Sequence, residues 1–144
     1  MEHPSKVLEY NDPAFLKHVE TYQNIISRMA GNSSACKNWC LVLVAAFLAF
    51  VIKDGHKFIA LLGFVPLLVF WGLDAYYLAL EQQFRNVFND HMKKMRDNVF
   101  TLEELFAVQT DGRIPDTFSS AFRSPATWPV YTALIALIIL SLFS

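Results

Sequence analysis

An acidic residue interrupts an otherwise apolar run of this chain, and two more charged residues follow it at helical spacing. Asp74 lies within the apolar run, and Glu81 and Arg85 come after it. On a helix these side chains share one face, and Glu81 and Arg85 form a favourable i, i+4 pair. A ring of such acids, one set from each of several subunits, would attract cations at the mouth of a pore. The alternative is that Asp74 bonds a hydroxyl, an amide or a Trp indole on a neighbouring helix and fixes the packing there. In either case the expected basic partner is Arg28 or Lys37.

Small and polar residues also gather just before the first apolar run, in "RMAGNSSACKNWC", residues 28–40. Small side chains let helices approach closely in or near lipid, and asparagine side chains can bond across helices. The pattern predicts either a tight packing junction or a hinge at the membrane surface. Its members are Gly31, Asn32, Ser33, Ser34 and Asn38.

The remaining chemistry-bearing residues give no sign of an enzyme. Cys36 and Cys40 are four residues apart, which suits packing on one helix face better than a zinc site. The four histidines (His3, His18, His56 and His91) show no metal-ligand spacing and are expected on the surface. No nucleophile motif or phosphate-binding loop is visible, and a net charge of −1 does not favour duplex nucleic acid as a partner. We therefore expect neither catalysis nor a metal or cofactor.

Composition predicts a membrane protein. Hydrophobic residues make up 54% of the 144 residues and charged residues only 17%, whereas a soluble domain carries about 25% charged residues. Two apolar runs, 39–52 and 58–80, are separated by the polar turn 53–57. Together they predict a helical hairpin that crosses the bilayer twice, and Pro66 is expected either to kink its second helix or to be accommodated by neighbouring helices.

Helical patterns continue beyond both apolar runs. Before the first, an amphipathic helix begins near Pro13, with its apolar stripe at Phe15, Val19, Tyr22, Ile26 and Met29. After the second, the pattern runs on to about residue 97. A helix over 58–97 would be about 60 Å long, while the hydrocarbon core is about 30 Å thick. About half of it should therefore stand in water as a stalk that packs against the first amphipathic helix.

A third apolar stretch, 127–144, is about long enough to cross the bilayer once more. The predicted fold is thus an all-α membrane protein in four parts. These are a tail and cytoplasmic amphipathic helix (1–38), a transmembrane hairpin (39–80), a cytoplasmic stalk and connector (81–126), and a third transmembrane helix (127–144). Within the connector, "TLEELFAV" suggests a short helix that Thr101 would cap.

Charge and aromatic residues predict the orientation. Most Lys and Arg residues near the span ends lie in the first part and in the stalk and connector, which places these parts and the N-terminus in the cytoplasm. The C-terminus would then lie at the outer face. Aromatic residues on the same side would mark the inner interface: Trp39, Trp71, Tyr76, Tyr77, Trp128 and Tyr131.

The order of these features resembles a known group. "QNIISRMAGNSSACKNWCLVLVAA", a brief turn and "FVPLLVFWGLDAYYLALEQQFRNVFN" resemble the SLATT group of bacterial membrane proteins, two-span effectors associated with nucleotide-signalling antiphage systems. They also resemble related small inner-membrane proteins of defence islands. The resemblance covers residues 13–97 and is strongest in "FWGLDAYYLALEQQFR".

The resemblance implies a homo-oligomeric pore, a tetramer or larger, in the bacterial inner membrane. A nucleotide or oligonucleotide signal, or a cytoplasmic sensor protein, would open it, and the lost membrane potential would stop growth before phage are released. An anionic signal needs basic partners, and the stalk and connector offer Lys93, Lys94, Arg96, Arg113 and Arg123. The alternative is a non-conducting adaptor that anchors or regulates a cytoplasmic partner. A transporter is disfavoured because no paired repeat is visible.

Overall fold

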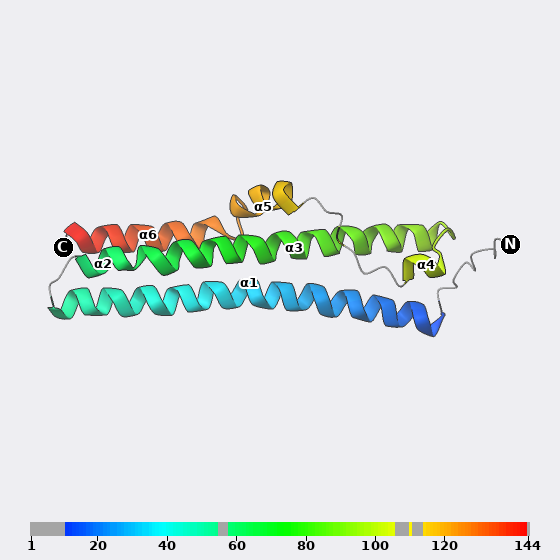
Figure 1. Cartoon of the computed structure of the whole chain (residues 1–144), viewed down its shortest axis with the longest axis horizontal. Coiled ribbons are helices and arrows are strands. Elements are labelled where there is room, and N and C mark those ends of the chain that lie inside the picture. Colours follow the sequence, from blue (N-terminus) through cyan, green and yellow to red (C-terminus); the bar gives the residue numbers. More distant parts are fainter. Residues whose placement is uncertain (1–10, 55–57, 106–109, 111–113, 144) are drawn as a thin grey trace.

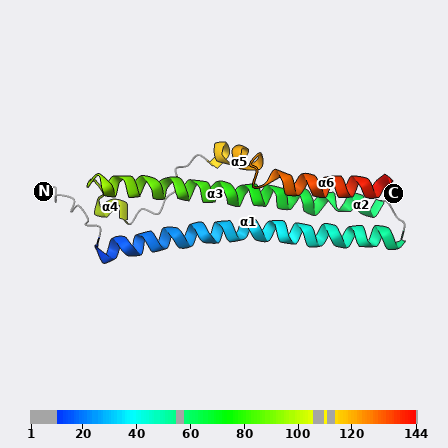
Figure 2. The same ribbon diagram turned by 180° about the vertical axis from the view of Figure 1, so that it is seen from behind.

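The computed structural model of the chain describes residues 11–54, 58–105, 110 and 114–143. The described residues form the helices α1 (Pro13–Asp54), α2 (Phe58–Leu62), α3 (Phe64–Arg96), α4 (Leu102–Leu105), α5 (Ile114–Phe122) and α6 (Trp128–Phe143). In both views α1 lies alongside α2 and α3 over its whole length, and α6 lies alongside one half of α3 (Figure 1, Figure 2). The predicted all-helical class is confirmed. The tail, the turn residues 55–57, Arg113 and Ser144 lie outside the described residues.

One buried stripe runs the length of α1. The helix starts where the Asp12 carboxylate accepts a hydrogen bond from the Ala14 amide at 2.9 Å, as N-cap residues do. From there the buried positions recur at helical steps: Phe15, His18, Tyr22, Ile26, Met29, Ser33, Cys36, Cys40, Val44 and Val51. The small residues 30–35 do not interrupt the helix, which runs unbroken from Pro13 to Asp54.

The helical segment that packs against α1 is interrupted three residues before Pro66. α2 ends at Leu62 and α3 starts at Phe64, with Gly63 between them. Pro66 is the third residue of α3, where a missing N–H costs nothing because the first turn has no intrahelical acceptor. Its ring would clash with the carbonyl four residues back, that of Leu62. The chain therefore turns at Gly63, whose amide bonds the Ala60 carbonyl at 3.0 Å.

Two glycines provide a matched test of this turn. A Cβ at Gly63 would lie 3.1 Å from the Ala60 carbonyl oxygen and 3.4 Å from Ile138 Cδ1, whereas one at Gly31 would meet open space. Gly63→Ala should lower stability by about 1–3 kcal/mol through overpacking. Gly31→Ala, inside α1, should raise it by about 0.5–1 kcal/mol. Thermal melting of both variants in one detergent checks this, and equal shifts would contradict the close approach at Gly63.

Cross-helix contacts fix the register of the bundle. α1 bonds α3 through His18 to His91 and through Lys37 to Asp74. α6 runs back along α3, since the Tyr131 hydroxyl bonds the Phe70 carbonyl at 3.2 Å. This register brings three tryptophans to about the same level of the bundle: Trp39 of α1, Trp71 of α3 and Trp128 of α6.

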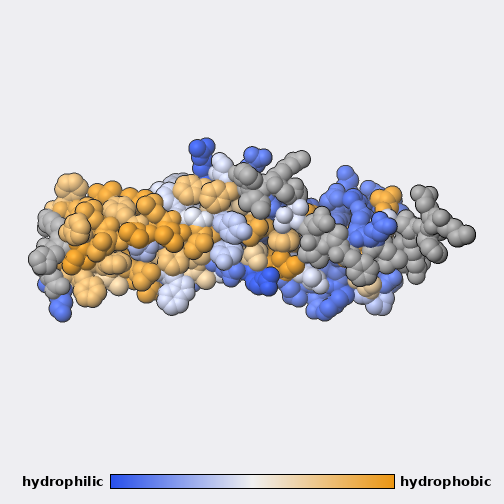
Figure 3. Space-filling view, in the orientation of Figure 1, coloured by the Kyte–Doolittle hydropathy of each residue, from blue (hydrophilic) through white to orange (hydrophobic). Residues whose placement is uncertain are grey.

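One half of the molecule is covered by apolar side chains. Of the large hydrophobic side chains exposed in the described chain, all but Leu16 and Val99 lie in residues 39–52, 58–76 and 128–143. We call this surface the apolar girdle, and Figure 3 shows it as the orange half, while the other end is mostly blue. The most apolar windows of the two long helices are only 22% and 28% buried within the chain. Both helices are long and apolar enough to cross a membrane.

The other half is a two-helix bundle, which we call the stalk (residues 13–28 of α1 and 81–96 of α3). At the end of the stalk away from the girdle, Phe100 and Leu105 pack with Phe15 and Met95 in one apolar cluster. α4 follows the stalk, and the Thr101 amide donates to the Glu104 carboxylate at 3.2 Å. This is the glutamate half of a capping box, and α4, which lies in the segment predicted to hold a short helix, begins at the next residue, Leu102. α5 lies against α3 near its middle (Figure 1).

Candidate functional site

The candidate site is a charged cluster between α1 and α3. Asp74 is fully buried. Its Oδ1 accepts a hydrogen bond from the Ser33 hydroxyl and another from Lys37 Nζ at 2.7 Å, and Lys37 Nζ also lies 3.0 Å from Ser33 Oγ. Of the two basic partners predicted for Asp74, the structure selects Lys37. Ser33 and Lys37 lie four positions apart on α1, so one face of this helix supplies both a hydroxyl and a cation to Asp74.

The second carboxylate oxygen is not engaged in the same way. Asp74 Oδ2 is buried and has no hydrogen-bond partner among the described residues. The Tyr131 hydroxyl of α6 lies close to this carboxylate, yet it donates to the Phe70 carbonyl. A buried unpaired carboxylate oxygen is costly. With one lysine and one aspartate, the cluster carries no net formal charge. Asp74 Oδ2 remains a hydrogen-bond acceptor that a small rearrangement could use.

The cluster lies at the boundary between the two halves of the molecule. Lys37 precedes exposed Trp39, and Asp74 lies one turn from Trp71. Trp71 stacks on Phe122 of α5, with ring centroids 4.3 Å apart, and on Tyr131 of α6, at 5.5 Å. Tryptophans favour the membrane interface. At a membrane interface an acid avoids most of the cost of about 2.5–3.5 kcal/mol that it would meet at a bilayer centre.

Glu81 and Arg85 form the predicted pair, with Arg85 Nε 2.8 Å from Glu81 Oε1. The side chain of Glu81 is 13% exposed and that of Arg85 is 58% exposed. Glu81 follows Asp74 by seven residues, about two turns of α3, so the two acids lie on the same side of this helix without touching.

The predicted packing residues fall on different sides of α1. Ser33 is buried against Asp74, and Asn32 is half-buried. Gly31, Ser34 and Asn38 are exposed at this level. Cys36 and Cys40 are buried, as expected for packing residues. Only one face of this segment thus serves packing within the chain, and the opposite face carries small and polar side chains.

Those of the predicted anion-binding residues that the structure describes do not converge on one site. Lys94 is already bonded to Glu104 and lies 3.3 Å from Asp90; the Glu104 hydrogen bond raises the pKa of Lys94, and the Lys94 hydrogen bond lowers the pKa of Glu104. Lys93 is exposed on the same end of α3. Arg123 follows Phe122, which stacks on Trp71, so it is about 35 Å from the end of α3 along the bundle.

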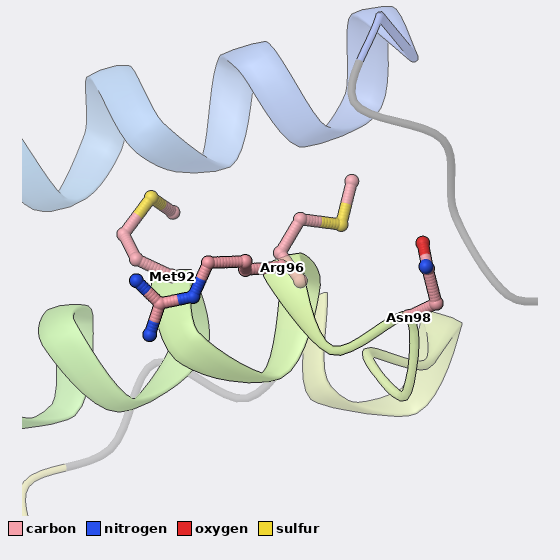
Figure 4. Close-up of a pocket in the computed structure, with 4 residues that line it drawn as sticks. Met92, Arg96 and Asn98 are labelled. Carbon is pink, nitrogen blue, oxygen red and sulfur yellow. The ribbon is translucent and has the colours of Figure 1, made fainter.

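A cavity of about 470 Å³ at the end of the stalk is lined by Met92, Met95, Arg96 and Asn98. Figure 4 shows Met92 and the Arg96 guanidinium side by side on α3, while Asn98 extends from the turn after the helix. Asn98 has a positive φ of 56°, which suits asparagine at a helix C-terminus. Arg96 thus offers one cation beside thioethers.

Two polar pairs of the structure were not predicted. His18 and His91, expected on the surface, are 5% and 7% exposed and are bonded to each other. His3 and His56 lie outside the described residues. Gln83 Nε2 of α3 bonds the Thr117 hydroxyl of α5 at 2.9 Å. His18 lies in the apolar stripe of α1, and this position was the sequence signal that could have predicted its burial.

No family model, curated protein or solved structure matches this chain.

Proposed function

We propose that the chain is a membrane effector that assembles into a homo-oligomeric pore. The apolar girdle supports its place in the bilayer, since so wide an exposed apolar surface needs lipid or protein to cover it. α1 and the α2–α3 pair would each cross once. α6 would add a third crossing, although at 16 residues it is short for one. The basic residues near the span ends support a topology with the stalk in the cytoplasm and the C-terminus at the outer face, in the bacterial inner membrane that the resemblance implies.

The observation that carries the pore proposal is the Ser33–Lys37–Asp74 cluster at the girdle's edge. Ionisable groups at membrane depth are costly, and they mark ion pathways more often than lipid-facing surfaces. In the resting chain Lys37 neutralises Asp74 at 2.7 Å. We propose that this is the closed state. A shift of α1 along α3 would separate the pair and free the carboxylates of several subunits to attract cations.

The stalk would receive the signal, either from a cytoplasmic sensor protein or as a nucleotide that binds its basic residues. Because α1 and α3 are continuous from the stalk into the girdle, a change in how the stalk helices pack would be transmitted to Lys37 and Asp74. Opening would depolarise the membrane and stop growth, which is the abortive-infection role that the resemblance to SLATT proteins implies.

Ion flux through proteoliposomes tests the role of the acids. The double variant Asp74→Ala, Glu81→Ala should lose at least tenfold of the cation flux of the triggered protein, because the pore mouth would lose its negative charge. The control is Glu20→Ala, an exposed stalk acid 2.8 Å from Lys17, and it should conduct normally. Flux retained in the double variant would remove both acids from the mechanism.

One observation favours a second function. Asp74 is fully buried and paired within its own chain, which also suits an adaptor whose acid only fixes packing. Such a protein would anchor a cytoplasmic partner through the stalk. It would form no ring and pass no current, so the subunit number separates the two proposals.

A further inference from the structure

The stalk contains a buried pair of histidines that joins three helices. His18 of α1 and His91 of α3 approach through Nε2 and Nδ1 at 3.0 Å. His18 Nδ1 also lies 2.8 Å from the carbonyl oxygen of Leu105, at the end of α4. The pair is surrounded by aromatic rings: Phe100 lies against both imidazoles, and so does Tyr22.

The hydrogen bonds allow a single arrangement of protons in the neutral pair. A carbonyl oxygen only accepts, so His18 Nδ1 must carry the hydrogen that goes to Leu105. Neutral His18 then has a bare Nε2, which accepts. His91 Nδ1 must therefore donate to it, which leaves His91 Nε2 bare. Both imidazoles are in the Nδ1–H form, and the two hydrogen bonds run in one direction from α3 through α1 to α4.

A second proton on the pair disturbs this arrangement. The first can bind the bare His91 Nε2, where it leaves both hydrogen bonds in place. The second, on His18 Nε2, would set two N–H groups against each other. The charge would also be buried among rings. Burial lowers the pKa of both histidines, and the neighbouring imidazole lowers that of His91 further. Glu104 of α4 and Asp90 of α3 act in the opposite direction, and Lys94 of α3 opposes protonation.

We propose that the His18–His91 pair is a proton-operated latch, which holds α1, α3 and α4 together at neutral pH and releases the stalk when the surrounding solution is acidified. This inference is independent of the proposed pore, because it concerns the water-exposed half of the molecule. The expected order of events follows from the contacts. The bond to Leu105 and the packing of Phe100 on both rings tie α4 to the pair, so α4 should separate first.

The pH window follows from the direction of the shifts. A histidine whose pKa is lower in the folded chain than its ordinary value of 6.5 binds fewer protons folded than unfolded. Its contribution to stability is complete above 6.5 and is lost as the pH falls below that value. Each unit of lowering corresponds to about a tenfold change in the opening equilibrium per histidine.

The test uses the full chain in lipid nanodiscs with ¹⁵N-labelled histidine. Long-range ¹H–¹⁵N spectra at pH 8 should show His18 and His91 both in the Nδ1–H form. Hydrogen exchange between pH 8 and 5, corrected for intrinsic rates, should then show protection of residues 88–95 and 100–105 falling at least tenfold below pH 6.5. Residues 41–51 in the girdle should show no such change.

The comparison variant is His18→Asn with His91→Leu. Asparagine keeps a donor for the Leu105 carbonyl, and leucine fills the space without titrating. Its corrected exchange should not depend on pH. The latch is refuted if the variant keeps the response of the parent, or if the parent shows none. Should the variant fail to fold, the tautomers and exchange of the parent decide alone: an Nε2–H form at either histidine at pH 8 overturns the proposal.

Discussion

Lys37→Met is expected to destabilise the folded chain by about 3–5 kcal/mol, because it leaves the carboxylate of Asp74 buried without its cation. Asp74 is fully buried, and the Lys37 side chain is only 21% exposed. The remaining Ser33 hydroxyl can donate one hydrogen bond but cannot balance the charge. The measurement is unfolding of the purified protein in one detergent, followed by helical circular dichroism.

Two further variants make this result specific. Lys17→Met removes a lysine that is 72% exposed and lies 2.8 Å from Glu20; such surface pairs contribute about 0–1 kcal/mol. The double variant Lys37→Met, Asp74→Leu removes both charges and should regain most of the loss, as apolar replacements of buried ion pairs often do. If Lys37→Met melted like Lys17→Met, the pair would not be a buried one.

The second large effect is expected at Trp71. Trp71→Ala removes the ring that stacks on Phe122 and on Tyr131, and it should cost about 3 kcal/mol. Since these partners belong to α5 and α6, the loss should detach both helices from α3. Limited proteolysis should then cut the chain between residues 106 and 127 at least tenfold faster than in the parent.

Trp39→Ala is the matched control for Trp71→Ala. Trp39 lies at about the same level of the bundle but is 61% exposed, so its removal should change stability by less than about 1 kcal/mol. A similar loss in both variants would mean that Trp71 acts through the lipid interface and not through the stack. Unchanged proteolysis in Trp71→Ala would show that α5 and α6 are held elsewhere.

Local pattern predicted the long helices well, because their signals are short-range. The three-and-four spacing of Phe15, Tyr22 and Ile26 is the buried stripe of α1, and the long apolar runs gave both helices that could span a membrane. Pro66 was expected either to kink the second helix or to be accommodated by its neighbours, and the structure interrupts this helix at Gly63. The interruption precedes the proline because a proline ring clashes with the preceding turn.

Contacts between distant segments could not be predicted in the same way. Whether Asp74 meets Arg28 or Lys37 depends on the register of α1 against α3, because the two basic residues lie nine positions, about two and a half helical turns, apart. The same register brings His18 to His91 and buries both. The position of His18 in the apolar stripe of α1 indicates burial, but its partner His91 becomes evident only when α3 is placed beside α1.

The connector was the least predictable part. α5 is held by Gln83 with Thr117 and by Trp71 with Phe122. These partners come from α3, more than 30 residues earlier in the chain, so local composition showed only a mixed segment. The five basic residues predicted as an anion site were grouped by their charge alone, and the sequence does not fix their positions relative to one another. Those that the structure describes lie at different levels of the bundle.

The subunit number in a lipid bilayer tests the central proposal most directly. Three helices from one chain cannot enclose a lumen and also bury the Asp74 cluster, so a pore requires several copies. Native mass spectrometry of the protein released from nanodiscs at neutral pH should give a single stoichiometry of four or more. A monomer or a dimer would contradict the pore and leave the membrane adaptor as the function of this chain.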